Sequence, residues 1–337
     1  MKGRVLIVRL RSLGDVVLTT PLLQVFREAG CETAAVVERP FHAVLEGLPC
    51  LDHLFVLEPG SLVEKWRTVR RLRRLGFDWA LDLHGGTTAA LLTVLSGARR
   101  TLGYGAARWR RLYTEALPPP SRIWGRDNLH TVEHQLAFCK YLGLTAEPIP
   151  PLRIALVPSE VDGVRRWLQE EGVAEGFALI HPAAAFATKQ WAVERFAALA
   201  DWMLERGWPV VATAGPGQES LLQRLAGLTR GGLRIFPPAP LPRFAALASL
   251  CGLYIGNDTG TTHMAAALGR PIVAIFGSSN PRAWRPWGTR YRLVGSNRDC
   301  IPCPGYHCLL YPEPRCIEDV SVGRVIAAIE SLEAEEG

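Results

Sequence analysis

Short apolar runs alternate with helix-like segments along the first half of the chain. The runs lack strict apolar–polar alternation, which is typical of parallel strands that are buried on both faces. We expect such strands at Arg4–Leu10, Thr33–Glu38, His53–Leu57, Trp79–Leu83 and Thr101–Tyr104. Helices are expected between them, among others at Pro21–Ala29, Ser61–Leu75 and Thr87–Leu95. This order of elements predicts a doubly wound α/β domain.

The same pattern returns after the Pro-rich segment Glu147–Leu152, which follows a helix-like stretch at Thr131–Leu142 and which we interpret as an interdomain linker. Strands are expected at Phe177–His181, Pro209–Ala214, Leu233–Phe236, Leu253–Gly256 and Pro271–Phe276. Helices are expected at Val193–Arg206, Gln218–Leu225, Pro242–Leu250, Thr261–Leu268 and Val320–Glu333. The sequence therefore predicts two Rossmann-like domains, residues 1–150 and 151–337, that face one another across a cleft. We leave open whether the last helix, 320–333, packs back on the first domain.

Composition agrees with a folded two-domain protein, because the 337 residues are 48% hydrophobic and 21% charged. No apolar run reaches the roughly 20 residues that a membrane-spanning helix needs. The apolar stretch of the opening segment is short, is interrupted by Arg9 and Arg11, and is not followed by a small-residue cleavage site. We therefore expect a cytoplasmic protein.

The formal charge of +6 lies entirely in the first half, where residues 1–150 hold 20 Lys and Arg against 14 Asp and Glu, while the rest is balanced at 18 against 18. Much of the surplus lies in the helix-like run Lys65–Arg74, and a second cluster follows at Arg99, Arg100, Arg108, Arg110 and Arg111. A solvated basic surface is the simplest interpretation. Attraction to acidic lipid headgroups or to an anionic acceptor is the functional one. Nucleic acid fits less well, since no aromatic-basic binding motif accompanies the charge.

Ligands of doubly wound sheets bind beyond the carboxyl ends of the strands, so the loops there are the places to look for chemistry. The first such loop is Arg9–Asp15, in which Gly14 allows a sharp turn and Asp15 stands near a helix start. Asp15 is either an ordinary helix cap or a catalytic carboxylate. If Thr20 caps the helix that Pro21 begins, Asp15 is released from capping.

The second loop, His181–Trp191, combines small residues with Lys189, whose mobile charge suits a phosphate, although a solvated lysine would look the same. The third, Gly256–Met264, places small polar residues at a helix start, where free N–H groups bind anions. Simple capping, with His263 buried against the sheet, is the alternative there. The dinucleotide fingerprint G-x-G-x-x-G and a Walker A sequence are both missing, which argues against a dehydrogenase and a P-loop enzyme.

Three motifs in this order, Ser12–Pro21, Thr188–Trp191 and Asn257–His263, resemble those of the bacterial heptosyltransferases of lipopolysaccharide core assembly, glycosyltransferase family 9. The resemblance extends from near the first residue to Cys316. It implies a GT-B fold and an inverting transfer from ADP-L-glycero-D-manno-heptose to the inner core of lipopolysaccharide.

The resemblance also implies a role for individual residues. It makes Asp15 the general base, places Lys189 at the donor's phosphate and sugar, and turns Asp258 toward the heptose. The donor diphosphate is expected at three residues: Thr259, Gly260 and His263. Glu219 fits the spacing of a carboxylate that binds the donor ribose.

This sequence departs from some family members, which carry two Thr shortly before the Lys, because Ala184 and Ala185 stand there. Phosphate contacts in this loop must then come from backbone N–H groups or from Thr188. No acidic pair is placed to hold a divalent ion, so we expect neither a catalytic metal nor a cofactor.

Four cysteines, Cys300, Cys303, Cys308 and Cys316, crowd into one short segment beside His307. Their spacing is compatible with a structural zinc or iron–sulfur site, with disulfides, or with free thiols, and the sequence leaves these open. Two other functions also stay open at this point: a nucleotide-sugar epimerase or hydrolase of the same architecture, and a non-catalytic nucleotide-sugar binding protein.

Overall fold

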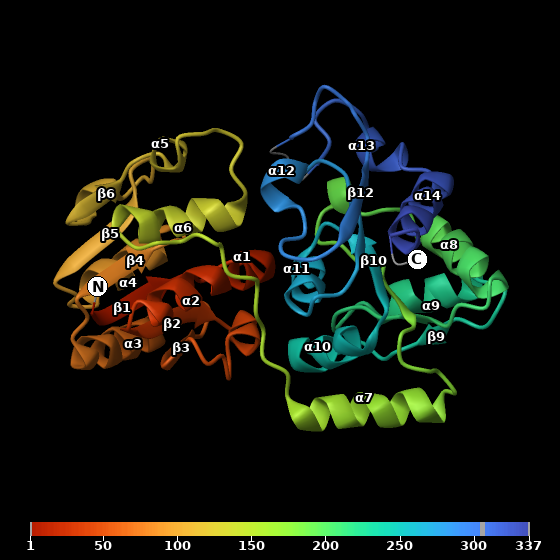
Figure 1. Ribbon diagram of the computed structural model, residues 1–337, viewed down its shortest axis with the longest axis horizontal. Helices are drawn as coiled ribbons and strands as arrows, with labels where there is room; N and C mark the ends of the chain where they lie inside the picture. The colour runs from red at the N-terminus through yellow and green to blue at the C-terminus, as the bar shows by residue number, and fades with distance from the viewer. Residues whose placement is uncertain (1, 304–306, 336–337) are drawn as a thin grey trace. The chain divides into compact units, whose positions relative to one another are not determined.

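The structure, a computed structural model, describes residues 2–303 and 307–335. It divides into two compact units, residues 1–155 and 156–337, which are treated separately below. Each unit is built on one parallel six-stranded sheet (Figure 1).

In the first unit the strands follow the spatial order β3-β2-β1-β4-β5-β6. Their bounds are β1 Gly3–Val8, β2 Cys31–Glu38, β3 His53–Leu57, β4 Trp79–Asp82, β5 Arg100–Tyr104 and β6 Glu115–Leu117. The helices are α1 Leu13–Val17, α2 Thr20–Glu28, α3 Leu62–Leu75, α4 Thr87–Leu95, α5 Pro120–Trp124 and α6 Thr131–Tyr141, with short 3₁₀ turns at Phe41–Val44 and Arg110–Leu112.

Both faces of this sheet are covered by helices. Alternate residues of β1, such as Leu6 and Val8, enter one apolar cluster with Val69 and Leu72 of α3 and with residues of α4. Helices α2 and α6 pack against each other, and α2 packs on β2. The unbroken apolar runs predicted from the sequence are therefore explained by burial on two sides.

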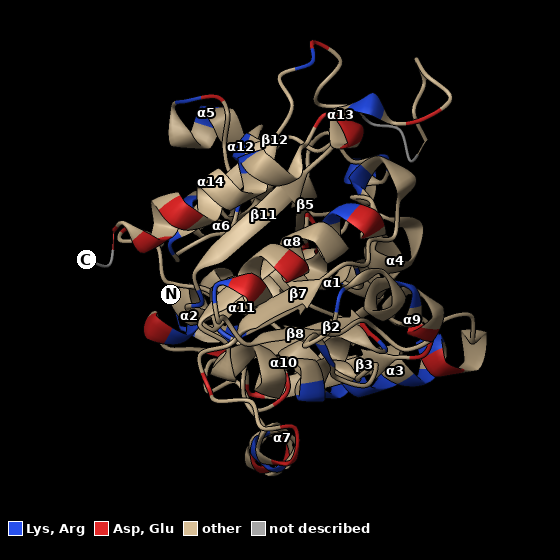
Figure 2. Cartoon of the chain, turned by 90° about the vertical axis from the view of Figure 1, so that its right-hand side faces the viewer, with Lys and Arg blue, Asp and Glu red and all other residues tan. Residues whose placement is uncertain are grey.

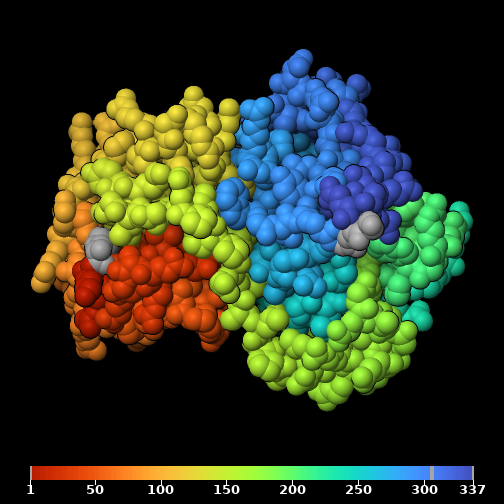
Figure 3. Space-filling view, viewed as in Figure 1, coloured from red at the N-terminus to blue at the C-terminus, as the bar shows by residue number. Residues whose placement is uncertain are grey.

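The Pro-rich segment after α6 is bound to its own unit rather than hanging free. The side chain of Gln24 in α2 donates to the carbonyl of Pro151 at 2.7 Å, and the backbone N–H of Arg153 donates to the hydroxyl of Thr20 at 3.0 Å. Figure 3 shows this yellow-green segment beside the red atoms of the first helices. The division between the units accordingly falls after Ala155, beyond the proline run.

The second unit repeats the topology in the order β12-β11-β10-β7-β8-β9. Its strands are β7 Ala178–His181, β8 Val210–Ala212, β9 Arg234–Ile235, β10 Leu253–Asn257, β11 Ile272–Phe276 and β12 Tyr291–Gly295. Its helices are α7 Pro158–Glu170, α8 Val193–Glu205, α9 Glu219–Leu228, α10 Leu241–Leu250, α11 Gly260–Ala267, α12 Pro281–Trp284, α13 Arg315–Glu318 and α14 Val322–Glu333, with a 3₁₀ turn at Ala187–Lys189.

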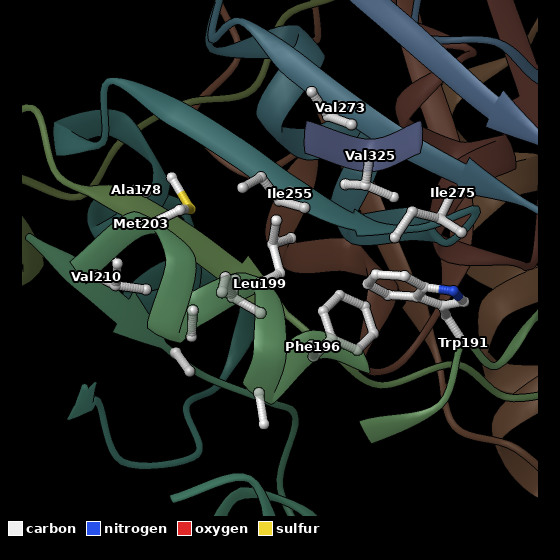
Figure 4. Packing of buried hydrophobic residues seen from close by; sticks show 14 of the residues in the cluster. Ala178, Trp191, Phe196, Leu199, Met203, Val210, Ile255, Val273, Ile275 and Val325 are labelled. Carbon is white, nitrogen blue, oxygen red and sulfur yellow. The ribbon is translucent and has the colours of Figure 1, made fainter. Parts of the chain in front are cut away.

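The core of the second unit closes around Trp191. Its indole packs edge-on against Phe196 at 4.8 Å and donates to the carbonyl of Val320 at 2.7 Å. Figure 4 shows Trp191 beside Phe196, with Ile275 and Val325 nearby. Val325 belongs to α14, whose buried face joins this same cluster. The buried face of the last helix is therefore part of the core of the second unit.

In both sheets the strand order reverses direction at one point, between β1 and β4 in the first unit and between β7 and β10 in the second. A crevice forms at such a point because the two connections that leave it run to opposite faces, and ligands of open α/β sheets bind there. The predicted pair of doubly wound parallel sheets is confirmed. All three loops singled out in the sequence follow strands at these two points: β1, β7 and β10.

Candidate active site

The loop after β1 holds Asp15 in a fixed position. Ser12 is the N-cap of α1, and Asp15 is the third residue of that helix. The Asp15 carboxylate accepts hydrogen bonds from the Ser12 hydroxyl at 3.0 Å and from the Ser12 backbone N–H at 3.4 Å, and it forms an ion pair with Arg9. Arg9 also donates to the carbonyl of Leu83, the residue directly after β4.

This geometry corrects one expectation. Asp15 takes part in a capping box at the start of α1, so it is not released from capping. The cap of the next helix is Thr19 rather than Thr20, with Pro21 in its first turn. The sequence concealed this because the short helix α1 lies between the loop and α2. Asp15 can still react, since its side chain is about 15% exposed.

The loop after β4 lies at the same reversal point and was missed in the sequence. Asp82 is fully buried and accepts from the backbone N–H groups of His84 and Gly85 at 2.8 and 2.7 Å and from the hydroxyl of Tyr113 at 2.6 Å. Burial, assisted by the positive charge of Arg9, lowers the pKa of His84. Its Nδ1 atom has no partner among the described residues. A neutral imidazole is thereby available near the loop of Asp15. The dipeptide Gly85-Gly86 after a strand was the signal that could have pointed to it.

The second unit brings Lys189 and Asp258 together. The ammonium of Lys189 lies 2.7 Å from Asp258 Oδ2, and the hydroxyl of Ser279 donates to the same oxygen. The Asp258 side chain is only 4% exposed and that of Lys189 is 26% exposed. Lys189 thus stays partly accessible to solvent, while Ser279 helps to hold the carboxylate.

Ser279 was not predicted, and the loop after β11 that carries it is locked against the Lys189 loop. The Ser278 N–H donates to the carbonyl of Thr188 at 3.2 Å. A Cβ atom at Gly277 would lie 1.9 Å from that same carbonyl oxygen, so only glycine permits the approach. The sequence signal was the Gly-Ser-Ser that follows the apolar run of β11.

Buried amides hold the backbone on the other side of Lys189. Asn257 accepts from the backbone N–H of Trp191 at 3.2 Å and donates to the carbonyl of Pro182 at 2.9 Å. Gln190 accepts from the backbone N–H of Ala184 at 2.7 Å. The Ala184 N–H is thus already used, which leaves Ala185 and Thr188 of the expected phosphate contacts. Thr188 is buried, and its hydroxyl has no partner among the described residues.

The helix α11 begins directly after Asp258. Thr259 is its N-cap, and Gly260 is its first residue. The N–H groups of a first helical turn have no partner within the helix and bind anions readily. His263 is buried one turn on, with its ring 6.4 Å from that of Trp284. The expected diphosphate residues therefore share one helix start.

Glu219 lies farther along the same edge of the sheet. It is the first residue of α9, which follows β8, the neighbour of β7. Its side chain is exposed and accepts from the backbone N–H of Gly217 at 3.2 Å. His181, the last residue of β7, is buried, and burial lowers its pKa to about 4, so it is neutral at pH 7.

The cysteine segment lies beside the Lys189 loop. Cys316 is buried with its sulfur 4.0 Å from the Thr188 carbonyl, and the N–H of Cys303 donates to Ser278. None of the eight cysteines, all of which lie among the described residues, is in a disulfide bond. Residues 304–306 of the segment lie outside the described residues. Within residues 2–303 and 307–335, no group of three or more His, Cys, Asp or Glu side chains is arranged to hold a metal ion.

Comparison with known protein families identifies the family to which the chain belongs. The family described as glycosyltransferase family 9 (heptosyltransferase) matches residues 65–312, well over half of the chain. The chain belongs to glycosyltransferase family 9. The resemblance seen in the three motifs is confirmed, and the alternatives of an epimerase, a hydrolase or a non-catalytic binding protein are not favoured.

Individual relatives of this family 9 glycosyltransferase support the assignment over nearly its whole length. It is 26% identical to lipopolysaccharide heptosyltransferase 1 of Pseudomonas aeruginosa, covering 98% of each chain. Its fold matches the family 9 glycosyltransferase of Veillonella parvula with a TM-score of 0.88 at 24% identity, covering 99% and 98% of the two chains. It also matches E. coli heptosyltransferase WaaC, solved with ADP, with a TM-score of 0.73 at 21% identity, covering 97% and 99%. These likenesses confirm the GT-B fold.

The helices of this family 9 glycosyltransferase have at most 14 residues in the part of the chain that the structure describes. Among those that the structure describes, none combines the length and the apolar character that crossing a bilayer requires.

Proposed function

We propose that this family 9 glycosyltransferase transfers heptose from ADP-L-glycero-D-manno-heptose to the inner core of lipopolysaccharide, with inversion at the anomeric carbon. The relatives are named lipopolysaccharide heptosyltransferases, and a structural neighbour was solved with ADP. The observation that carries the proposal is the placement of Lys189, Asp258 and the start of α11 at one reversal point.

The donor diphosphate is held by the second unit. Its negative charge is bound by the accessible part of the Lys189 ammonium and by the first-turn N–H groups of α11 at Thr259 and Gly260. His263 lies one turn farther along the same helix. Thr188 and the Ala185 N–H are the contacts that remain in the second loop. Positive charge and N–H dipoles stabilise the diphosphate most as it departs, so they lower the barrier and not only the donor's dissociation constant.

Sugar and ribose are recognised by carboxylates. Asp258 accepts hydrogen bonds from heptose hydroxyls while Lys189 and Ser279 fix its orientation. Glu219, exposed at the start of α9, accepts from the ribose hydroxyls. Protein groups neutralise the negative charge of the diphosphate, so the reaction proceeds without a divalent ion or a cofactor.

Asp15 is the general base. Inversion requires the acceptor hydroxyl to attack opposite the departing diphosphate while a carboxylate removes its proton. Ser12 and Arg9 hold the Asp15 carboxylate in one orientation, which is what a base must have when the hydroxyl arrives.

The assay is incubation with ADP-heptose in the presence and absence of a heptose-free inner-core acceptor. Transfer predicts ADP release that depends on the acceptor and a product heavier by one heptose. ADP release or donor isomerisation without the acceptor would instead identify a hydrolase or an epimerase.

The enzyme is proposed to work in the cytoplasm, in peripheral contact with an anionic membrane. The support is the charge of the first 150 residues, 20 cationic against 14 acidic, and an acceptor that is itself lipid-linked.

A further inference from the structure

An apolar groove of about 180 Å³ lies between α3 and α4 of the first unit, on the side of the sheet that these helices cover. Its apolar walls come from both helices: Leu62, Trp66, Val69, Leu91, Leu92 and Leu95. Three of these side chains stand unusually far into solvent, Leu62 at 72%, Trp66 at 59% and Leu91 at 48% exposed. Val63 adds a fourth exposed apolar side chain next to them.

Helical spacing places a basic face directly beside this groove. Leu62, Trp66 and Val69 recur at intervals of four and three and so share one face of α3. Arg70 and Arg74 recur at an interval of four on the neighbouring face. The helix carries six Lys and Arg against one Glu, and Figure 2 shows them as a row of blue along α3.

The cations of α3 divide into two groups. Arg71 lies over the ring of Phe55, Arg73 donates to the carbonyl of Leu95 at 2.8 Å, and Arg67 is paired with Glu64. Arg71 and Arg73 thus fasten α3 to neighbouring parts of the first unit, whereas the charge of Arg67 is paired within the helix. Lys65, Arg70 and Arg74 have no acidic partner in the part of the chain that the structure describes. Their charge remains available to an anionic partner outside the protein.

We infer that α3 and α4 form a docking surface for an anionic phospholipid bilayer, into which Leu62, Trp66 and Leu91 insert while Lys65, Arg70 and Arg74 contact the headgroups. The inference rests on the proposed function, since it names the surface that brings the enzyme to a lipid-linked acceptor. A bilayer interface matches this surface on both counts. Its acyl boundary accepts leucine and tryptophan, and its headgroups supply the negative charge. An apolar protein partner would cover the apolar walls of the groove, but it would leave the three unpaired cations without an anionic partner.

Flotation of the full-length protein with liposomes tests the inference. Vesicles of phosphatidylcholine alone are compared with vesicles that also contain phosphatidylglycerol, neither of which carries an acceptor sugar. We expect binding to the anionic vesicles, weakening as salt is raised. The variant Arg70→Glu/Arg74→Glu should bind at least tenfold more weakly, since each lost cation weakens binding by about fivefold.

The apolar walls are tested by Leu62→Ser/Trp66→Ser/Leu91→Ser, which leaves the charge unchanged and should also weaken binding by roughly tenfold or more. The matched control is Arg122→Glu/Arg166→Glu, which changes the net charge equally at exposed positions outside α3 and α4 and should bind like the wild type. Circular dichroism of each variant establishes that it is folded.

Three outcomes would overturn the inference: no binding to anionic vesicles, equal binding by the apolar variant, or equal weakening in the control. A concentration-dependent dimer that the apolar variant abolishes would assign the groove to a second copy instead. Heptose transfer to a deacylated, water-soluble acceptor separates this inference from the proposed function. The α3 variants should keep that activity, whereas its absence in the wild type would contradict the proposed function and leave the vesicle result standing.

Discussion

Replacing Lys189 by alanine removes the cation that is paired with Asp258, the residue directly before the N-cap of α11. The N–O distance of 2.7 Å marks a charge-assisted hydrogen bond, and such a bond typically contributes about 1.5–3 kcal/mol. If the donor diphosphate meets the accessible part of the same ammonium, the dissociation constant for ADP should rise by roughly one to two decades.

The same change also affects stability, and the two effects must be separated. Breaking a fully buried ion pair costs about 3–5 kcal/mol, but here Lys189 is about a quarter exposed and Asp258 keeps the hydrogen bond from Ser279. We therefore expect the free energy of unfolding to fall by only about 1–2 kcal/mol, which leaves the variant folded at room temperature.

Isothermal titration with ADP in the presence of a chelator is the assay, with urea unfolding measured alongside. Arg224→Ala is the matched control, because it breaks an exposed ion pair with Glu194 in the same unit and should change neither the ADP affinity nor the stability by much. A folded Lys189→Ala variant that binds ADP as tightly as the wild type would refute the assignment. A strict requirement for magnesium in ADP binding would refute the metal-free account of the diphosphate.

Two further predictions concern the second unit. Gly277→Ala forces a Cβ against the Thr188 carbonyl, so it should destabilise the protein by at least about 2 kcal/mol and weaken ADP binding. Gly163→Ala lies in the middle of α7 with open space around it and should instead stabilise the protein by about 0.5–1 kcal/mol. Thermal unfolding of both variants measures the two changes in stability. Because burial lowers the pKa of His181 to about 4, the unfolded chain binds a proton at this residue more readily than the folded protein does. The contribution of neutral His181 to the free energy of unfolding should therefore be complete above pH 6.5 and should fall as the pH drops toward 4. The fall should be smaller in His181→Phe, and urea unfolding at a series of pH values measures the difference.

The inner strands of both sheets, which are buried on both faces, could be predicted, and so could the edge strands β3 and β9. β3 was placed with its observed ends, and the central strands of both sheets were placed to within two residues at most of their ends, because an unbroken apolar run between two helices is typical of a strand in a parallel sheet. The edge strands β6 and β12 were missed. β6 has three residues, and β12 is half-exposed and contains Arg292, so neither shows an apolar run.

Helix α7 was also missed. Only Val164 and Leu168 are buried among its thirteen residues, so its apolar stripe is narrow, although Val161, Val164 and Leu168 recur at the helical intervals of three and four.

Some residues of the candidate site could likewise be predicted from the sequence, and others could not. Residues that stand in loops directly after strands, such as Asp15, Lys189 and Asp258, could be proposed from position alone. Their partners could not. Arg9 precedes Asp15 by six residues on the far side of the turn, and Ser279 reaches Asp258 across twenty-one residues of chain. The pairing of Ser279 with Asp258 arises from the parallel register of β10 and β11, which one sequence does not reveal.

The catalytic role of Asp15 is the claim on which the proposed mechanism depends most. Asp15→Asn keeps the size of the side chain and most of its ability to cap α1, but it cannot take a proton. It also leaves Arg9 without its ion pair. Asp52→Asn is therefore the control, because it breaks the comparable pair with Arg27, 2.8 Å apart, where the chain enters β3, away from the reversal point.

The decisive measurement is kcat for heptose transfer by Asp15→Asn, taken beside its ADP affinity and its thermal unfolding. A general base that acts only as the hydroxyl attacks predicts a fall in kcat of about 10²–10⁴-fold with nearly unchanged ADP affinity, while Asp52→Asn loses stability and keeps its kcat. A folded Asp15→Asn enzyme that retains more than about a tenth of the wild-type kcat would contradict the proposed mechanism and leave Asp15 as a helix cap.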